Sequence, residues 1–257
     1  KTFSQLDNLW KFNAVIGFNP FYYAEHDLAE PIKDIGKKFL IIHKESVHSP
    51  VEHIINFEVY RDQNKKHFAN KVAVYCEYEK KNLIESNFLK SEQLEVVGCA
   101  RSDYCFELRN KKPLENKIVY FMIEADRNER GEETKKIPKD MEVNWFDLAS
   151  LTIKHLVEYA LKHPDVDIVF KGKGNVHSLD DLPKNLPLNC SFELGNPGHK
   201  FLKDAKVVIC FNSTILIEAI LANREVVIPN FGIDRSKLDK FIYKSPNKFV
   251  DKKEIFF

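Results

Sequence analysis

Polar side chains gather inside an otherwise apolar stretch, Cys210 to Gly232, with the sequence CFNSTILIEAILANREVVIPNFG. Asn212, Ser213 and Thr214 come directly after a β-branched run, and Glu218 follows about one helical turn later. Hydroxyl groups and backbone N–H groups at such a place can donate hydrogen bonds to a phosphate. The carboxylate of Glu218 needs a partner in apolar surroundings, and a pair of ribose hydroxyls would serve. These residue types therefore point to the binding of a nucleotide.

Two strands and a helix must position these residues. The flanking runs Lys206–Phe211 and Glu225–Pro229 are short, β-branched and nearly all apolar, which predicts buried strands of a parallel sheet. Between them, Thr214–Ala222 predicts a helix, with Asn212 or Ser213 as its N-cap. The loop of such a unit lies at the carboxyl end of the first strand, where the unpaired N–H groups of the helix favour an anion.

Strand-like and helix-like patterns alternate along the rest of the chain, which predicts an α/β fold with two Rossmann-like parallel-sheet domains. The pattern predicts earlier strands at 13–18, 38–43, 71–75 and 94–98, helices at 22–35 and 77–87, and a helix-like patch at 3–12. A second series predicts strands at 117–123, 167–170, 190–194, 206–211 and 225–229, and a helix at 145–162. We place the domains at 1–112 and 113–257, expect about five strands in the second, and expect the first to be truncated because it lacks an obvious first strand. The polar stretch 126–144 predicts a solvated loop or a lid at the carboxyl edge of the second sheet.

Composition excludes several classes of protein. The chain has 257 residues, 44% hydrophobic and 30% charged, and 39 basic against 38 acidic residues give a net charge of +1. This balance argues against nucleic acid as a main partner. Five cysteines without a C-x-x-C pair predict reduced residues in a cytosolic protein. No stretch predicts a membrane span, although a peripheral contact with the inner face of the membrane stays open.

These segments resemble those of a known family. Asn212–Pro229 resembles the nucleotide-binding helix of GT-B-fold glycosyltransferases, Lys71–Asp103 resembles a strand-helix-strand stretch of bacterial surface-polysaccharide (capsular or lipopolysaccharide) transferases, and His163–Gly174 resembles the "hPdi.vvfKpHP" stretch of those enzymes and of polyglycerol-phosphate polymerases. The pattern is also related to that of sugar-nucleotide 2-epimerases. The resemblance covers about the last two thirds of the chain. It implies transfer of a sugar from a nucleotide-sugar donor to a glycan or lipid-linked acceptor, with no metal or other cofactor.

The resemblance implies roles for individual residues. Lys171, Ser213 and Thr214 would contact the donor phosphates, and Glu218 would take the ribose hydroxyls. Each also has a structural alternative: an N-cap for Ser213 and Thr214, a solvated strand-end lysine for Lys171, and a carboxylate tied to a neighbouring loop for Glu218. The chain departs from the family at Lys171–Gly174 (KGKG), where a histidine would stand in third place. It also has Asn223 where a glycine usually ends the helix, which is tolerable because asparagine adopts the left-handed conformation.

The resemblance also implies a catalytic base that activates the acceptor, at a strand end of the first domain. Asp27 follows the first strand, next to Glu25 and His26, although acids also favour helix starts for electrostatic reasons. His43 and Glu45 lie directly at the end of another strand.

Arg101 and Asp103 close the last strand of the first domain and are candidates for the cleft, or else an ion pair that fixes the turn. Two other functions stay open: a nonhydrolysing sugar-nucleotide epimerase, and a non-catalytic module that binds a nucleotide or a partner. The epimerases carry a Glu-Glu pair before the alanine of this helix, whereas Ile217 precedes Glu218 here.

Overall fold

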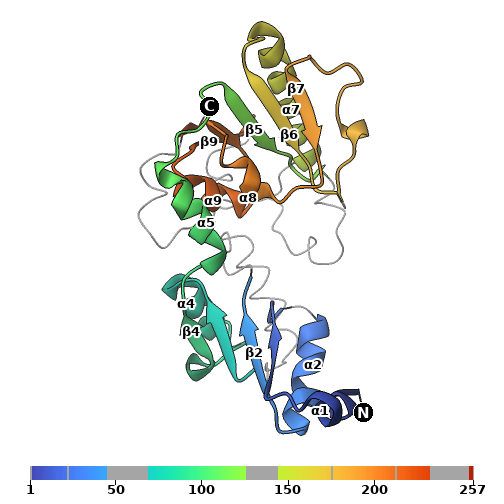
Figure 1. Ribbon diagram of the computed structural model, residues 1–257, viewed down its shortest axis with the longest axis vertical. Coiled ribbons are helices and arrows are strands. Elements are labelled where there is room, and N and C mark those ends of the chain that lie inside the picture. The colour runs from blue at the N-terminus through green and yellow to red at the C-terminus, as the bar shows by residue number, and fades with distance from the viewer. Residues whose placement is uncertain are drawn as a thin grey trace. The chain divides into compact units, whose positions relative to one another are not determined.

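The chain forms two compact units, residues 1–100 and 101–257, each with its own parallel sheet (Figure 1). The computed structural model describes residues 2–21, 23–44, 69–125, 144–174, 176–211, 213–231 and 255–256. The predicted loop or lid at 126–144 lies almost entirely outside these residues. The predicted fold class, two Rossmann-like α/β units, is confirmed.

The first unit contains a four-stranded sheet in the order β1-β2-β3-β4, and all its strand pairs are parallel. Its elements are α1 (Thr2–Trp10), β1 (Ala14–Gly17), α2 (Tyr23–Asp34), β2 (Lys38–Ile42), β3 (Lys71–Val74), α4 (Glu77–Glu85), the 3-10 turn Ser91–Gln93 and β4 (Leu94–Val96). Every one of these strands and α-helices matches a predicted element, with bounds that differ by a few residues.

The core of the first unit lies on one face of its sheet. Phe39 and Ile41 of β2 and Val72 and Val74 of β3 are buried, and they pack with Ala29 and Ile32 of α2, Leu83 of α4 and Leu94 of β4. Exposed and buried residues alternate along β2, and β3 shows the same alternation. Such alternation is the pattern of a sheet that packs on one side.

The second unit contains a six-stranded parallel sheet in the order β10-β9-β8-β5-β6-β7. Its elements are the 3-10 turn Ala100–Ser102, α5 (Asp103–Glu107), the 3-10 turn Leu108–Asn110, β5 (Lys117–Phe121), α7 (Trp145–Lys162), β6 (Asp167–Lys171), the 3-10 turn Leu179–Asp181, β7 (Cys190–Glu193), α8 (Gly198–Phe201), β8 (Val207–Ile209), α9 (Ile215–Leu221), β9 (Glu225–Ile228) and β10 (Ile255–Phe256). The five predicted strands are present, and the two-residue β10 adds a sixth that the sequence did not indicate.

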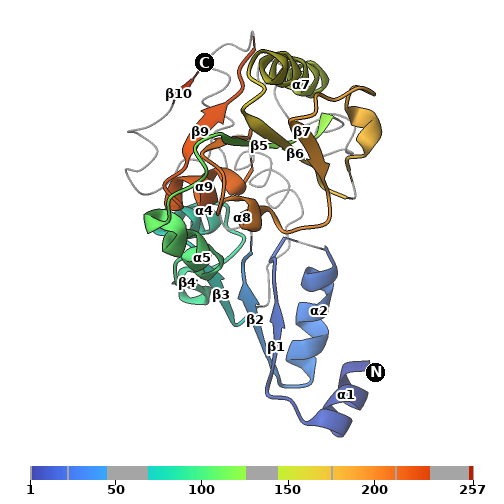
Figure 2. The same cartoon turned by 45° about the horizontal axis from the view of Figure 1, so that its top comes forward.

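Helices cover both faces of the second sheet (Figure 2). The chain moves from β5 to β6 in one direction and from β8 to β9 in the other. Because parallel crossovers are right-handed, the opposite directions place α7 on one face and α9 on the other. Four successive residues of β6, Ile168 to Lys171, are accordingly buried.

Local sequence explains the long helix α7. The side chain of Asn144 caps it by accepting a hydrogen bond from the backbone N–H of Asp147 at 3.1 Å. A buried stripe runs along one side of the helix at intervals of three and four residues: Trp145, Leu148, Ala149, Thr152, Ile153, Leu156 and Ala160. Pro164 follows its last residues, which fits the end of a helix.

The helical segment 101–111 is fastened to the second unit by the buried guanidinium of Arg224. Its Nε donates to the carbonyl of Leu202 at 2.7 Å, Nη1 to that of Lys111 at 3.1 Å, and Nη2 to those of Leu108 and Lys203 at 3.4 and 3.3 Å. These carbonyls lie at the ends of helical segments, where a cation is favoured. The sequence-based division lies after residue 112, whereas the compact units divide after Ala100.

The end of α9 turns the chain so that Arg224 points inward. Asn223 has a positive φ of 57°, as expected for an asparagine in the place of a terminal glycine. Its N–H donates to the carbonyl of Ile220 at 3.0 Å, and the N–H of Arg224 donates to that of Ala219 at 2.9 Å. These two bonds are the Schellman pattern that satisfies the last carbonyls of a helix.

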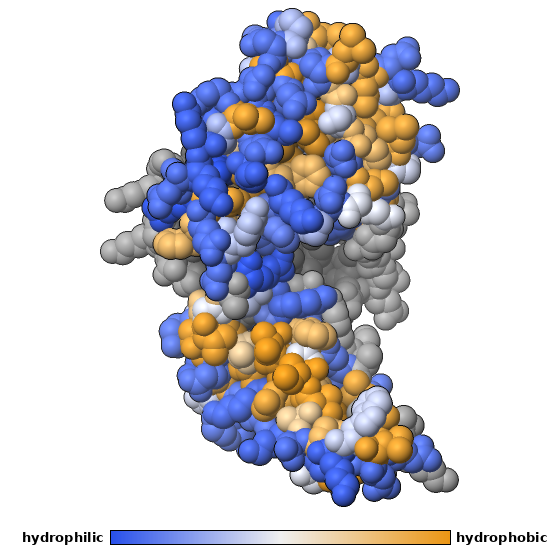
Figure 3. Space-filling model, in the orientation of Figure 1, coloured by the Kyte–Doolittle hydropathy of each residue, from blue (hydrophilic) through white to orange (hydrophobic). Residues whose placement is uncertain are grey.

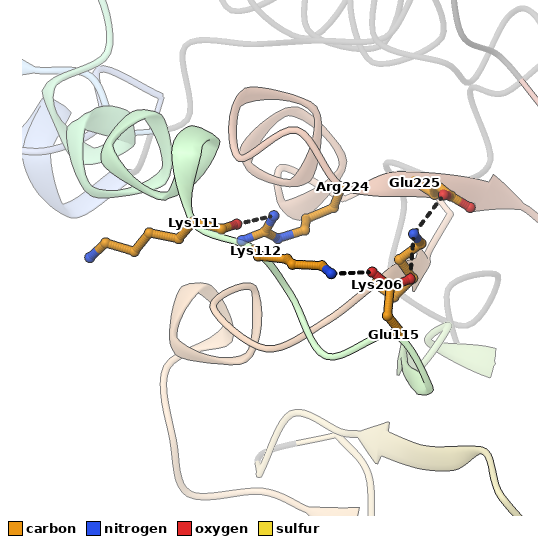
Figure 4. A network of polar contacts seen from close by, with 6 residues as sticks. All are labelled: Lys111, Lys112, Glu115, Lys206, Arg224 and Glu225. Carbon is orange, nitrogen blue, oxygen red and sulfur yellow. Dashed lines mark hydrogen bonds and ion pairs between the residues drawn. The ribbon is translucent and has the colours of Figure 1, made fainter.

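Figure 4 shows a second cationic group beside the first but at the surface. Lys206 Nζ lies 2.9 Å from a carboxylate oxygen of Glu115 and 3.6 Å from one of Glu225, and Lys112 also approaches Glu115 at 3.6 Å. Such exposed pairs contribute little to stability because water and salt screen them. The buried Arg224 and the exposed Lys206 therefore form a natural matched pair for a test.

We expect Arg224→Met to destabilise the protein by about 3 kcal/mol or more, because several buried carbonyls lose their donor at once. Thermal unfolding followed by circular dichroism measures this as a lower Tm. Lys206→Met is the control and should change the Tm little. Equal changes in the two variants would contradict the role assigned to Arg224.

Candidate functional site

The candidate site lies at the carboxyl edge of the second sheet. All its strands are parallel, so the loops that follow β5, β6, β7 and β8 meet at one edge. The strand order reverses between β5 and β8. From β5 the chain continues to β6 and β7 on one side, and β8 and β9 then follow on the other side of β5. In open α/β sheets, ligands bind in the crevice at such a reversal.

The loop from β8 to α9 carries the predicted phosphate contacts. Ser213 and Thr214 are half-buried, and α9 begins at Ile215. The prediction that Asn212 or Ser213 caps this helix is wrong: the N-cap position is Thr214, in a helical conformation and without a side-chain capping bond. Asn212 lies outside the described residues. The structural alternative thus holds in part, since Thr214 is the N-cap residue through its backbone, and the phosphate contacts of Ser213 and Thr214 stay predictions.

Glu218 is paired with Arg101. The Nη2 atom of Arg101 donates to Glu218 Oε1 at 2.6 Å, and the Glu218 side chain is 5% exposed against 46% for Arg101. The sequence offered two partners for this carboxylate, a pair of ribose hydroxyls or a neighbouring loop, and the structure shows the second, while the ribose contact stays a prediction. Arg101 supplies that partner from the turn before α5, which Arg224 holds in place. Asp103 begins α5 as an exposed residue.

Lys171, the last residue of β6, is buried together with its charge. Its ammonium donates to the carbonyls of Gly172 at 2.5 Å and Leu194 at 2.9 Å, and it lies 5.8 Å from the ring centre of Phe201. Burial lowers the pKa of Lys171, and the nearby Glu193 partly counters this effect. The side chain is thus no solvated strand-end lysine.

Sequence reasoning missed a cluster on the neighbouring loops. Glu124, just beyond β5, is buried and accepts from the ammonium of Lys173. His177 is buried as well: its Nδ1 accepts from the N–H of Lys173 at 3.1 Å, and its Nε2 lies 3.1 Å from the carbonyl of Ile123. Because a carbonyl only accepts, Nε2 must carry the proton, and the ring is neutral. A polar residue directly after a buried strand was the available signal for Glu124.

The candidate catalytic residues of the first unit differ from one another in burial. His43 is fully buried beyond β2, with its ring edge-on to Phe21 at 5.1 Å between centres. Asp27 is exposed on α2, and Glu45 lies outside the described residues. Their catalytic roles stay predictions. The sequence also leads us to expect one common groove bordered by His43, Glu45, Lys171, Ser213 and Glu218, and this too stays a prediction.

Glu25, not Asp27, contacts the loop after β1. Its carboxylate accepts from the backbone N–H of Phe18 at 2.8 Å and from that of Asn19 at 2.8 Å. A side chain at Gly17 would collide with this carboxylate, which explains the glycine. An internal carboxylate therefore occupies the N–H groups at the end of β1.

In the part of the chain that the structure describes, the cysteines and acidic groups form no cluster typical of a metal centre. The five cysteines are free, and burial raises the pKa of Cys210 to about 12. Within the described ranges, no group of three or more His, Cys, Asp or Glu could hold a metal ion. The D-x-D pattern at Asp165 and Asp167 lies at the amino edge of the sheet, where Asp167 pairs with Lys117 at 3.3 Å. Independence from metals stays a prediction.

Solved structures share this fold. The UDP-GlcNAc 2-epimerase of Methanocaldococcus jannaschii matches with a TM-score of 0.52 at 12% identity, over 100% of this chain and 69% of that one. A candidate UDP-N-acetylglucosamine 2-epimerase of Listeria monocytogenes gives 0.55 at 11%, over 88% and 60%. The wall teichoic acid polymerase TagF gives 0.49 at 13%, over 86% and 56%.

The two epimerase structures confirm the expected GT-B-like fold, and at these identities the likeness concerns the fold alone. The chain spans between about half and about two thirds of the length of these three structures. No protein-family model and no curated protein matches the chain. None of the helices in the described part is long and apolar enough to cross a membrane.

The lowered pKa of Lys171 generates a prediction about stability. Since the folded state disfavours the charged ammonium, Lys171→Met should not lower the Tm near pH 7, and we expect a rise of up to about 2–4 °C. The penalty is fully present below the folded pKa and disappears as the pH rises past the unfolded value. The difference between variant and wild type should therefore shrink toward about pH 10.

Differential scanning fluorimetry at the two pH values checks this expectation, with the exposed Lys200→Met on α8 as control. A Tm near pH 7 several degrees below that of the wild type would show that the bonds to the two carbonyls outweigh the burial of the charge.

Proposed function

We propose that the chain is a glycosyltransferase that moves a sugar from a nucleotide-activated donor to a surface-polysaccharide or lipid-linked glycan acceptor without a metal. The observation that carries the proposal is the position of Glu218: a buried carboxylate in the helix that follows the β8 loop, at the reversal of a parallel sheet. The fold shared with UDP-GlcNAc 2-epimerases supports it. We place the reaction in the cytoplasm, at the inner face of a membrane.

The donor would lie across the carboxyl edge of the second sheet. Ser213, Thr214 and the N–H groups around them would bind the phosphates, and Lys171 would bring a positive charge close to them. Oε2 of Glu218 would accept a hydrogen bond from a ribose hydroxyl, while Oε1 accepts one from Arg101. The guanidinium thus orients the carboxylate and balances its charge in a buried place.

The reaction breaks the bond between the anomeric carbon and the donor phosphate and forms a bond to an acceptor oxygen. The acceptor hydroxyl proton passes to a base, for which Asp27, His43 and Glu45 stay the candidates. Negative charge accumulates on the departing phosphate in the transition state. Lys171 and the β8 loop would stabilise that charge.

Ligand binding and turnover test the proposal. UDP, GDP, CDP and CMP are screened for a rise in Tm, which mass action requires of the cognate nucleotide; the rise corresponds to about 2.7 kcal/mol at 100-fold excess over Kd. Release of nucleotide only when acceptor is present would establish a transferase. Interconversion of free sugar nucleotides, or binding without turnover, would overturn the proposed reaction.

Glu218→Gln tests the ribose contact itself. Loss of a charge-assisted hydrogen bond should raise the Kd of the cognate nucleotide about tenfold to a hundredfold. The Tm should also fall, because Arg101 loses the carboxylate with which it pairs. Isothermal titration calorimetry on the folded variant separates the two effects.

The matched control is Glu225→Gln, which removes a carboxylate at the amino edge of the same sheet. It should leave the nucleotide affinity unchanged. If Glu218→Gln lowers the Tm but binds the nucleotide as tightly as the wild type, Glu218 only ties down the turn at Arg101.

A further inference from the structure

An ion pair at the carboxyl edge of the second sheet joins a buried carboxylate to an exposed lysine. Glu124 lies just beyond β5 and Lys173 just beyond β6, and the ammonium of Lys173 donates to Glu124 Oε1. The side chain of Glu124 is 9% exposed, whereas that of Lys173 is 65% exposed. Hydrophilic side chains cover much of the second unit's visible surface in Figure 3, so an ion pair by itself is no sign of function. The burial of one partner distinguishes this pair.

The opposite edge of the same two strands provides a comparison. Lys117 begins β5 and Asp167 begins β6, and these register partners bring their charged groups to 3.3 Å. Both side chains are partly exposed, at 21% and 46%, and such a pair contributes little to stability. Glu124 differs, because a buried carboxylate is costly unless a cation and hydrogen bonds compensate it. Its place at the carboxyl edge therefore calls for an explanation that the amino-edge pair does not need.

His177 fastens the backbones that carry the two partners. Its Nε2 donates to the carbonyl of Ile123, directly before Glu124, at 3.1 Å, and its Nδ1 accepts from the backbone N–H of Lys173 at 3.1 Å. The N–H of His177 also donates to the carbonyl of Lys173 at 2.8 Å. A Cβ at Gly172 would lie 2.9 Å from that of His177, so the glycine permits this close approach. The backbone is thus held at both partners, while the long side chain of Lys173 lies in water.

The ammonium of Lys173 is accessible to a ligand. It has several N–H donors at the end of a flexible stem, so it can change its partner without a change of the backbone. Lys171, two residues earlier, is buried, and its ammonium donates to two carbonyls at the sheet edge. Of these two lysines, Lys173 is therefore the one that an anion can reach at the edge where open α/β sheets bind ligands.

We propose that Lys173 is an anion-binding residue whose ammonium passes from Glu124 to a diphosphate group of the ligand. In the unliganded protein, Glu124 holds this ammonium at the sheet edge. The same carboxylate opposes the anion, because it competes for the ammonium and repels a second negative charge. That the diphosphate belongs to a sugar donor rests on the function proposed above, whereas the exchange of partners does not.

Substitutions at the two partners should have opposite effects on the binding of inorganic pyrophosphate, a probe that presents linked phosphate groups without base or sugar. Isothermal titration calorimetry on the full chain measures its Kd. Lys173→Gln should raise the Kd about tenfold, because a charge-assisted hydrogen bond is lost. Glu124→Gln should lower the Kd about threefold to tenfold, because the competing carboxylate disappears.

The double variant Glu124→Gln/Lys173→Gln should bind pyrophosphate at least about tenfold more weakly than Glu124→Gln. Neither of these two variants retains the buried carboxylate, so their comparison holds even where Lys173→Gln alone lowers the Tm. Lys117→Gln and Asp167→Asn break the ion pair at the amino edge of the same strands. They are the matched controls and should leave the Kd unchanged.

A Kd that rises in both single variants would mean that the pair only holds the loop in shape, and the exchange would be wrong. A wild type that binds no pyrophosphate would contradict it as well. If pyrophosphate binds through Lys173 but none of the nucleotides binds, the exchange is supported and the sugar transfer is overturned. If a nucleotide binds equally well to the wild type and both single variants, the exchange is overturned and the sugar transfer is not.

Discussion

The buried guanidinium of Arg224 is the contact on which the candidate site depends. It donates to four backbone carbonyls, two in the segment 101–111 and two just after α8. That segment has few buried side chains of its own, Cys105 and Leu108 among them. Without the guanidinium, its helical ends would face the interior with unpaired acceptors. Arg101 can meet Glu218 because the turn that carries it belongs to this fastened segment.

The short helix α9 thus carries a residue of the candidate site and ends beside a contact that stabilises the fold. Glu218 lies on it and takes the cation of Arg101, while Arg224 lies just beyond its end and holds the segment from which Arg101 comes. The left-handed Asn223 between them turns the chain after the last helical residue. A change at either end of α9 should therefore reach the other end through the segment 101–111.

The sequence predicts most elements because strand and helix periodicities are local properties. Sequence patterns do not predict a contact between two residues that are far apart in the chain. Arg101 and Glu218 are 117 positions apart, and Lys173 and Glu124 are 49 apart, so no spacing rule pairs them. Glu25 and Asp27 look alike in sequence, and only the approach of the loop after Gly17 selects Glu25. The two-residue β10 is too short to show a periodicity at all.

Strand order accounts for the contrast between the two units. In the second sheet the chain reverses direction after β7, which places helices on both faces and a reversal of strand order between β5 and β8. In the first sheet the described strands run β1 to β4 without a reversal, so their order creates neither a second layer of helices nor a switch point of this kind. This topological difference explains why burial is continuous along β6 but alternates along β2.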